Sequence, residues 1–377
     1  MNLPTVHILD YNPKHINEME PFRLLIVEDN EQDLNTFRDS LEIYRKQKNR
    51  DVHSVESRNL DDAMEKLDSS FDGAIIDLRL KEQNDGNKIT QQILDSHFRI
   101  PIAILTGTPD SADPKLTYLG VFKKGEIEYS QLLDMFWEIH SSGLTRIMGG
   151  RGVIETSLND VFLKNLLPQR DTWIEYGKSD SPRTEKALLR YALSHLLQLL
   201  DDDMERCFPE EVYIHPPVSV GVRTGNIMMR RTDYKPFVVL SPACDLVIRK
   251  NTGRAKSDQV MLVEVESYNT VRTPILKGEK KDGREKKIAR LLQNNYADNY
   301  HWLPRTSVFD GGFINFRMLY STTHKELSET FDAPALQISP SFVKDIVARF
   351  SSYYARQGQP DIDYQAFVNK LSLPVDE

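Results

Sequence analysis

The stretch LLIVEDN, residues 24–30, decides the fold of the first third of this chain. Its four apolar residues, 24–27, are typical of a strand buried on both faces of a parallel sheet. Two adjacent carboxylates, Glu28 and Asp29, follow directly. Neighbouring acids at the end of a buried strand repel each other unless a cation lies beside them, and open α/β sheets bind their ligands at the carboxyl ends of the strands. We therefore expect a hard metal ion near residue 29.

Strands and helices alternate from residue 22 to residue 142. Further strands are expected at 51–56, 73–80, 100–108 and 121–124, and helices at 31–48, 59–67, around 89–94 and around 132–139. Asp85-Gly86 is interpreted as a turn, and two prolines between residues 106 and 124 predict a short or irregular fourth helix. This order predicts a doubly wound, five-stranded parallel α/β sheet.

Unusual polar residues stand at the ends of the predicted strands. They are Glu28 and Asp29, Asp77, Thr106, and Lys123 or Lys124. The carboxyl ends of parallel strands share one edge of a sheet, so these side chains are expected to converge there. Carboxylates suit Mg²⁺, one of them can attack phosphorus, and a hydroxyl and an ammonium stabilise charge on the transferring oxygens. The pattern predicts phosphoryl transfer.

This constellation resembles the receiver domain of two-component response regulators, over about residues 22–142. The matching pieces are the acid pair in LLIVEDN, the acid in AIIDLRL, the hydroxyl in AILTGT and the lysine in VFKKG. The resemblance implies that Asp77 accepts a phosphoryl group from a histidine kinase or phosphotransfer protein. It further implies Mg²⁺ as cofactor, bound by Glu28, Asp29, Asp77 and the backbone carbonyl of Arg79. Thr106 and Lys124 would contact the phosphoryl oxygens.

The sequence departs from the family pattern at two positions near the lysine. Gly125 follows Lys124 where the family usually has proline, and Val121 stands where it often has an aromatic residue. Only one of Lys123 and Lys124 can face the site, because side chains alternate along a strand. Lys124 fits the motif better.

Composition limits the remaining possibilities. The 377 residues suggest two or three domains, and no run is long and apolar enough for a membrane helix. No secretory signal precedes residue 22, so the cytoplasm is the expected location. Residues 1–145 carry 16 Lys and Arg against 26 Asp and Glu, whereas the rest carries 32 against 30. Neither part has the basic face of a duplex-binding domain, and nucleic acid is not an expected partner.

The domain order is interpreted as an extension at 1–21, a receiver at 22–142, a glycine-rich linker at 143–152, a helical connector at 153–206 and an α+β output domain at 207–377. Helices are expected at 153–166, from Pro182 to about residue 200, and from Pro340. Short β-type runs at 212–214, 218–222, 227–230, 237–240 and 260–266, with a strand near 312–320, predict a small antiparallel sheet or barrel. The connector could mediate a homodimer.

Two features of the second part suggest chemistry, and each has a simpler interpretation. Cys244 and Asp245 could be a nucleophile and its partner, but a lone cysteine at a strand end is usually a small core residue. The basic run 277–290 could bind RNA or a phosphorylated ligand together with the aromatic residues downstream of it, Tyr296, Tyr300, His301 and Trp302. Its interspersed acids favour a solvated helix face.

The sequence therefore predicts a phospho-dependent response regulator with a non-DNA-binding output domain and no separately assignable enzymatic activity. Two alternatives stay open. One is an effector enzyme gated by the receiver, for example in stress response or anti-phage defence. The other is a scaffold whose receiver keeps the fold without the chemistry.

Overall fold

The computed structural model describes residues 21–80, 85–198, 206–218, 221–249, 252–278, 280–356, 364–365 and 367–368. The predicted extension at 1–21 lies outside these residues apart from Pro21. The chain divides into two compact units, Met1–Met204 and Glu205–Glu377. Among the described residues, no helix combines the length and the apolar character needed to cross a bilayer.

A five-stranded parallel sheet forms the centre of the N-terminal unit. Its strands are β1 (Phe22–Val27), β2 (Val52–Ser57), β3 (Gly73–Ile76), β4 (Ile102–Thr106) and β5 (Gly120–Lys123). They lie in the order β2-β1-β3-β4-β5. All four strand pairs are parallel. The predicted doubly wound sheet of a receiver fold is confirmed.

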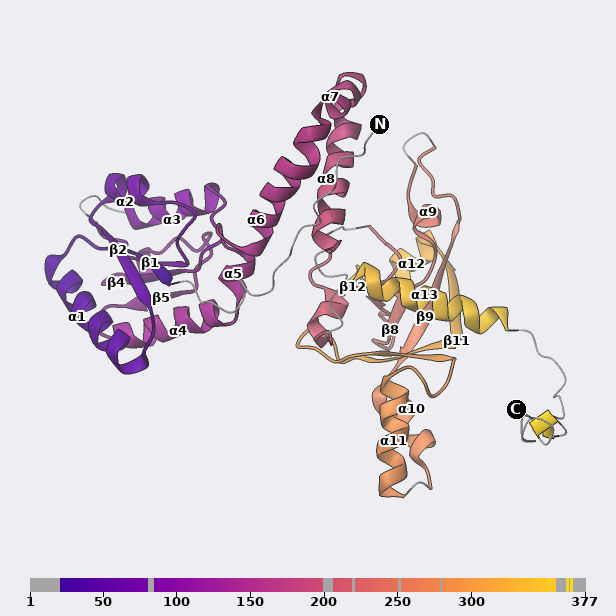
Figure 1. Ribbon diagram of the computed structural model, residues 1–377. Coiled ribbons are helices and arrows are strands. Elements are labelled where there is room, and N and C mark those ends of the chain that lie inside the picture. Colours follow the sequence, from indigo (N-terminus) through magenta and orange to yellow (C-terminus); the bar gives the residue numbers. More distant parts are fainter. Residues whose placement is uncertain are drawn as a thin grey trace, which may run out of the picture. The chain divides into compact units, whose positions relative to one another are not determined.

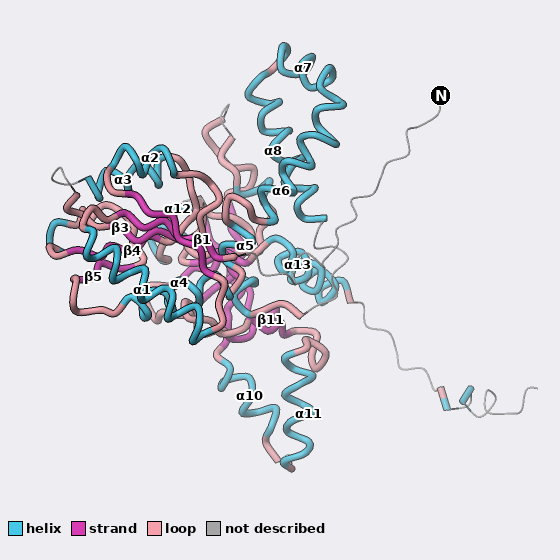
Figure 2. Tube along the Cα trace, turned by 60° about the vertical axis from the view of Figure 1, so that its left-hand side comes forward, coloured by secondary structure: helices cyan, strands magenta, loops and turns pink. Residues whose placement is uncertain are grey.

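Helices cover both faces of this sheet (Figures 1 and 2). They are α1 (Glu31–Lys48), α2 (Leu60–Lys66), α3 (Asp85–Asp95) and α4 (Tyr129–Ser141). Side chains alternate along β1, so Leu24 and Ile26 pack with α1 and α4, whereas Leu25 and Val27 pack with α2 and α3. All four of these β1 side chains are buried. The run LLIV is thus apolar because both of its faces are covered.

The start of α3 corrects the turn predicted at Asp85-Gly86, because both residues belong to the helix. A Cβ on Gly86 would lie 2.3 Å from the carbonyl oxygen of Asp77. The glycine is therefore explained by the close approach of α3 to the chain after β3, not by a turn. Between β4 and β5 the regular structure of the described chain is the 3₁₀ turn η2 (Pro109–Ser111), which confirms the predicted short or irregular fourth helix.

A helical hairpin ends the N-terminal unit. A short helix, α5 (Leu144–Met148), lies in the predicted linker. It is followed by α6 (Val153–Asp160), η3 (Val161–Leu166), η4 (Leu167–Gln169), α7 (Arg170–Ser179) and α8 (Ser181–Gln198). We call residues 153–198 the arm. Its two halves pack through Trp173 and Tyr191, whose ring centroids lie 5.8 Å apart.

The C-terminal unit is built on a seven-stranded antiparallel sheet. Its strands are β6 (Tyr213–Ile214), β7 (Asn226–Met229), β8 (Pro236–Val239), β9 (Gln259–Glu266), β10 (Tyr300–Leu303), β11 (Gly312–Thr323) and β12 (Leu336–Ile338). They lie in the order β10-β11-β9-β8-β7-β12-β6. The antiparallel sheet was predicted, but β10 and β12 were not. The strand predicted at 218–222 is wrong at its described residues, which form bends and loop, and residues 219–220 are not described.

Helices and short turns accompany this second sheet. They are η5 (Pro209–Val212), α9 (Ala243–Leu246), α10 (Tyr268–Leu276), α11 (Lys281–Leu292), α12 (His324–Thr330) and α13 (Pro340–Ala355). Ile346 of α13 packs on one face of the sheet with Val263 and Ile314. Leu327 of α12 packs with Phe237 and Leu262 on the other.

Candidate functional site

Backbone pairing brings four predicted residues to the carboxyl edge of the N-terminal sheet. The amide of Asp77 donates to the carbonyl of Val27, and the amide of Lys124 donates to the carbonyl of Thr106, each at 2.9 Å. Glu28 follows β1, Asp77 follows β3, Thr106 ends β4 and Lys124 follows β5. Since β4 lies between β3 and β5, Thr106 ends the strand that separates the strands preceding Asp77 and Lys124.

The Lys124 ammonium lies at the centre of the site. Its Nζ donates to Glu28 Oε2 at 2.6 Å, to Asp33 Oδ2 at 2.7 Å and to Asp77 Oδ2 at 2.7 Å. The neighbouring Lys123 is exposed and pairs with Glu126 at 2.9 Å. Alternation along β5 therefore directs Lys124, and not Lys123, toward the acids.

One ammonium does not compensate three carboxylates. Burial alone would lower the pKa of Lys124, but its hydrogen bonds to Asp33, Asp77 and Glu28 outweigh burial and raise that pKa. Burial raises the pKa of Glu28 to about 7, in spite of the bond from Lys124, and the Asp77 carboxylate adds to the rise. The site therefore carries excess negative charge, and an additional cation would stabilise it.

Two residues of this site escaped the sequence analysis. Asp33 stands in the first turn of α1, where Asn30 caps the helix by accepting from the amides of Gln32 and Asp33. Tyr129 opens α4, and burial followed by the charge of Glu28 raises its pKa to about 12. A carboxylate in the first turn of the helix after β1 was a usable signal for Asp33. Nothing in the sequence around Tyr129 pointed to this edge.

The other predicted residues lie at the same carboxyl edge of the sheet. Asp77 Oδ1 accepts from the amide of Arg79 at 3.1 Å, while Asp29 is half-buried beside Glu28. Thr106 is fully buried, and its hydroxyl oxygen is 3.4 Å from the amide of Thr108.

Mg²⁺ suits the kind of donor found here, since carboxylate and carbonyl oxygens are its usual protein ligands. Within the described part of the chain, no three acidic, histidine or cysteine side chains are arranged to hold an ion. Lys124 lies where Glu28, Asp33 and Asp77 converge. The oxygen donors and the uncompensated negative charge of this site therefore suit Mg²⁺. The ion could bind only if the Lys124 ammonium moved out of part of the space between the three carboxylates.

The glycine after the lysine has a conformational reason. Gly125 has a φ of +84°, and proline is restricted to a φ near −65°. Proline, which usually follows the lysine in receiver domains, cannot adopt this backbone. The backbone at residue 125 therefore favours glycine and excludes proline.

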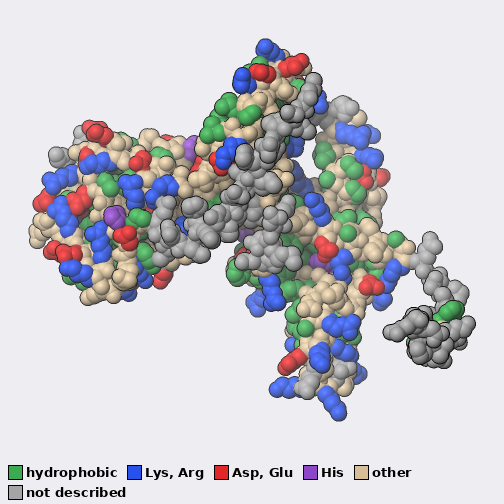
Figure 3. Space-filling view, viewed as in Figure 1, with side chains coloured by type: hydrophobic (Ala, Val, Ile, Leu, Met, Phe, Trp, Pro, Cys, Tyr) green, Lys and Arg blue, Asp and Glu red, His purple; other side chains and the backbone are tan. Residues whose placement is uncertain are grey.

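The candidates of the C-terminal unit do not form a comparable constellation. The Cys244 thiol lies 3.5 Å from Asp245 Oδ1, and Asp245 pairs with Lys256 at 3.7 Å. Among the described residues, the Cys244 thiol thus contacts a carboxylate and no group that could act as its base. The basic run 277–290 lies on the hairpin of α10 and α11, where Lys and Arg side chains gather (Figure 3).

Comparisons with known proteins concern the N-terminal region. No protein-family model matches the chain, and no curated protein sequence matches it. Among solved structures, the receiver domain of HemR from Leptospira biflexa is similar at 21% identity, covering 32% of this chain and 95% of that one, with a TM-score of 0.27. The signal receiver domain of an HD domain-containing protein from Pseudomonas fluorescens Pf-5 is similar at 18% identity, covering 33% and 99%, with a TM-score of 0.28.

A third similar structure is the N-terminal domain of a response regulator/sensory box/GGDEF protein from Carboxydothermus hydrogenoformans, at 22% identity, covering 31% and 92%, with a TM-score of 0.26. Each likeness spans about a third of this chain. The N-terminal third is thus similar to receiver domains of response regulators, and its own sheet order agrees with that fold.

Proposed function

We propose that this chain is a response regulator of a two-component phosphorelay, which accepts a phosphoryl group on Asp77 and switches a non-DNA-binding output unit. The observation that carries the proposal is the pairing of Asp77 with Lys124 at 2.7 Å, on the carboxyl edge of a parallel sheet. Ligands of such sheets bind at this edge. The phosphodonor is a histidine kinase or a phosphotransfer protein.

Asp77 is the nucleophile in this proposal. Its carboxylate oxygen attacks the phosphorus of the donor phosphohistidine, the P–N bond breaks, and the phosphoryl group remains on Asp77 as an acyl phosphate. Lys124 then pairs with a phosphoryl oxygen instead of the carboxylate, and the Thr106 hydroxyl donates to another. Glu28, Asp29, Asp77 and the carbonyl of Arg79 would hold Mg²⁺, and the ion would supply positive charge that offsets the charge of the phosphoryl oxygens.

Transfer of the phosphoryl group would release Lys124 from Asp77. The hydrogen bond from Lys124 to Asp33 of α1 would then change as well. A change in these contacts biases the unit between two conformations. The arm then carries the change to a second copy of the chain. Its α8 leaves Leu189, Leu193 and Leu197 between 50% and 64% exposed at i, i+4 and i+8, a stripe suited to helix pairing in a homodimer.

Beryllofluoride with Mg²⁺, a mimic of the phosphoryl group, tests the proposal. At about 100 times its dissociation constant it should stabilise the N-terminal unit by ~2.7 kcal/mol, which is several degrees in melting temperature. Asp77→Asn should abolish the shift, and the exposed Asp110→Asn should keep it. An unchanged melting temperature in the unmodified chain would instead support a scaffold with an inactive receiver.

A further inference from the structure

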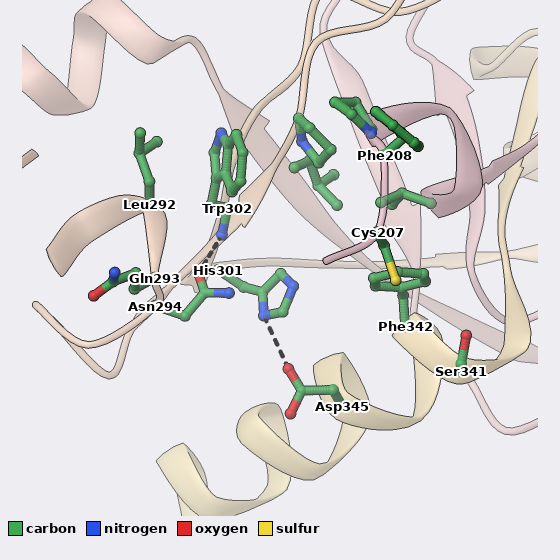
Figure 4. Close-up of a pocket in the computed structure, with 14 residues that line it drawn as sticks. Cys207, Phe208, Leu292, Gln293, Asn294, His301, Trp302, Ser341, Phe342 and Asp345 are labelled. Atoms are coloured by element: carbon green, nitrogen blue, oxygen red, sulfur yellow. Dashed lines mark hydrogen bonds and ion pairs between the residues drawn. The ribbon is translucent and has the colours of Figure 1, made fainter. Parts of the chain in front are cut away.

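A cavity of about 490 Å³ opens in the C-terminal unit, at the seam where its sheet curls on itself. The edge strands β6 and β10 do not pair with each other. They are joined instead by the Tyr213 hydroxyl, which donates to the carbonyl of Pro304 at 2.7 Å. The cavity lies beside this bond, between β10, the start of α13 and the segment that leads into β6 (Figure 4). Its volume is in the range of small-molecule sites.

Aromatic side chains form much of the wall. Phe208, Trp302 and Phe342 line the cavity from three separate segments. Phe208 is 74% exposed, so this part of the wall is open to an incoming molecule. Three rings around one space favour a flat, apolar body.

His301 gives the cavity a polar end. The residue is 6% exposed, and its Nδ1 has no hydrogen-bond partner within the described structure. Asp345 Oδ2 lies 3.7 Å from this nitrogen, which is too long for a direct hydrogen bond. Figure 4 shows the two side chains pointing toward each other. A buried ring nitrogen without a partner is costly, and a ligand donor placed beside the two groups, within hydrogen-bond distance of both, would satisfy it.

The charges select the kind of ligand. Burial, followed by the charge of Arg349, lowers the pKa of His301 to about 4, so the ring is neutral near pH 7. Arg349 donates to the carbonyls of Asn294 and Tyr300 at 2.9 and 3.2 Å and does not line the cavity. Among the described lining residues, Asp345 alone carries a charge at that pH. A cation is therefore favoured over an anion.

We propose that this cavity binds a small aromatic amine. The ring system lies among Phe208, Trp302 and Phe342, and the ammonium donates to Asp345 and to His301 Nδ1, with the His301 proton on Nε2. The proposal does not depend on phosphorylation of the N-terminal unit. It assigns the C-terminal unit a ligand of its own.

The two cysteines of the chain provide a reporter and its control. Cys207 lines the cavity, whereas Cys244 lies in α9, and both are exposed. The probe is 2-naphthylmethylamine, with 2-naphthylacetate as an anion of similar shape. The rate of iodoacetamide alkylation is measured at each cysteine of the full chain by peptide mass spectrometry. Saturating amine should slow alkylation of Cys207 at least threefold and leave Cys244 unchanged, and the anion should slow neither.

Asp345→Asn tests the ammonium contact. The Asp345 side chain is 62% exposed, so its replacement should not disturb folding. The amine concentration needed for half-protection of Cys207 should rise about tenfold, as expected for the loss of one charge-assisted hydrogen bond. The control is Asp310→Asn, which replaces an exposed acid elsewhere in the C-terminal unit. It should leave the amine concentration for half-protection of Cys207 unchanged. The proposal is overturned if the amine fails to protect Cys207, if the anion protects it equally, or if both variants bind the amine like the unmodified chain.

Discussion

Replacing Lys124 with Met is expected to destabilise the N-terminal unit by about 3 kcal/mol at pH 8, the order found when one partner of a buried ion pair is removed. Methionine keeps the length of the side chain but leaves Glu28, Asp33 and Asp77 without their shared cation. Urea unfolding of the full chain measures this, followed by Trp137 fluorescence with Trp173 and Trp302 replaced by Phe.

The loss of stability caused by Lys124→Met should depend on pH in a defined direction. The pKa of Glu28 is raised from 4.5 to about 7 in the folded chain. Between these values the folded state holds a proton that the unfolded state has lost, so this group makes stability fall as pH rises. Without Lys124 the rise in the pKa is larger, and the penalty of Lys124→Met should therefore grow from pH 5 to pH 8.

Lys123→Met is the matched control, since this neighbour on β5 is exposed and pairs only with the exposed Glu126 in the described structure. It should leave the unfolding curve unchanged at every pH, because exposed pairs contribute little. Equal effects of the two replacements, or a penalty that shrinks toward pH 8, would contradict the placement of Lys124 among the acids.

In the homodimer that we propose, the double variant Leu189→Glu/Leu193→Glu is expected to weaken self-association at least 100-fold. Each leucine that an interface buries contributes about 1.5–3 kcal/mol, and a factor of 100 corresponds to ~2.7 kcal/mol. Sedimentation equilibrium over a range of concentrations measures the dimer dissociation constant directly.

Ser194→Glu/Gln198→Glu adds the same charge to exposed polar positions of α8 and should leave the dimer intact. The arm would not be the dimer interface if both double variants had the same dissociation constant. A chain that sediments as a monomer at all concentrations would also exclude it.

Much of the N-terminal fold could be predicted because its central strands β1, β3 and β4 are continuous, almost fully buried apolar runs. Glu28, Asp77, Thr106 and Lys124 could be predicted to lie together because each stands at the end of a predicted strand, and parallel pairing brings these ends to one edge of the sheet. Asp33 was missed because it reaches the site from the first turn of a helix and not from a strand.

Prediction was weaker where long-range pairing decides the structure. β12 has three residues and pairs with β6 and β7, which are distant in sequence. β10 carries the phrase YHWL, which has neither the length nor the alternation of an independent strand signal. At 218–222 the error is the reverse. These residues have a high β-propensity, but the described ones form no strand. His301 was noted only as an aromatic neighbour of the basic run, because its burial depends on α13.

The most direct test of the central claim is the intact mass of the full chain after incubation with acetyl phosphate and Mg²⁺. We predict a gain of one phosphoryl group, mapped to Asp77, absent in Asp77→Asn and retained in Asp110→Asn. No gain in the unmodified chain, or a gain that persists in Asp77→Asn, would contradict the assignment of Asp77 as the phosphoacceptor.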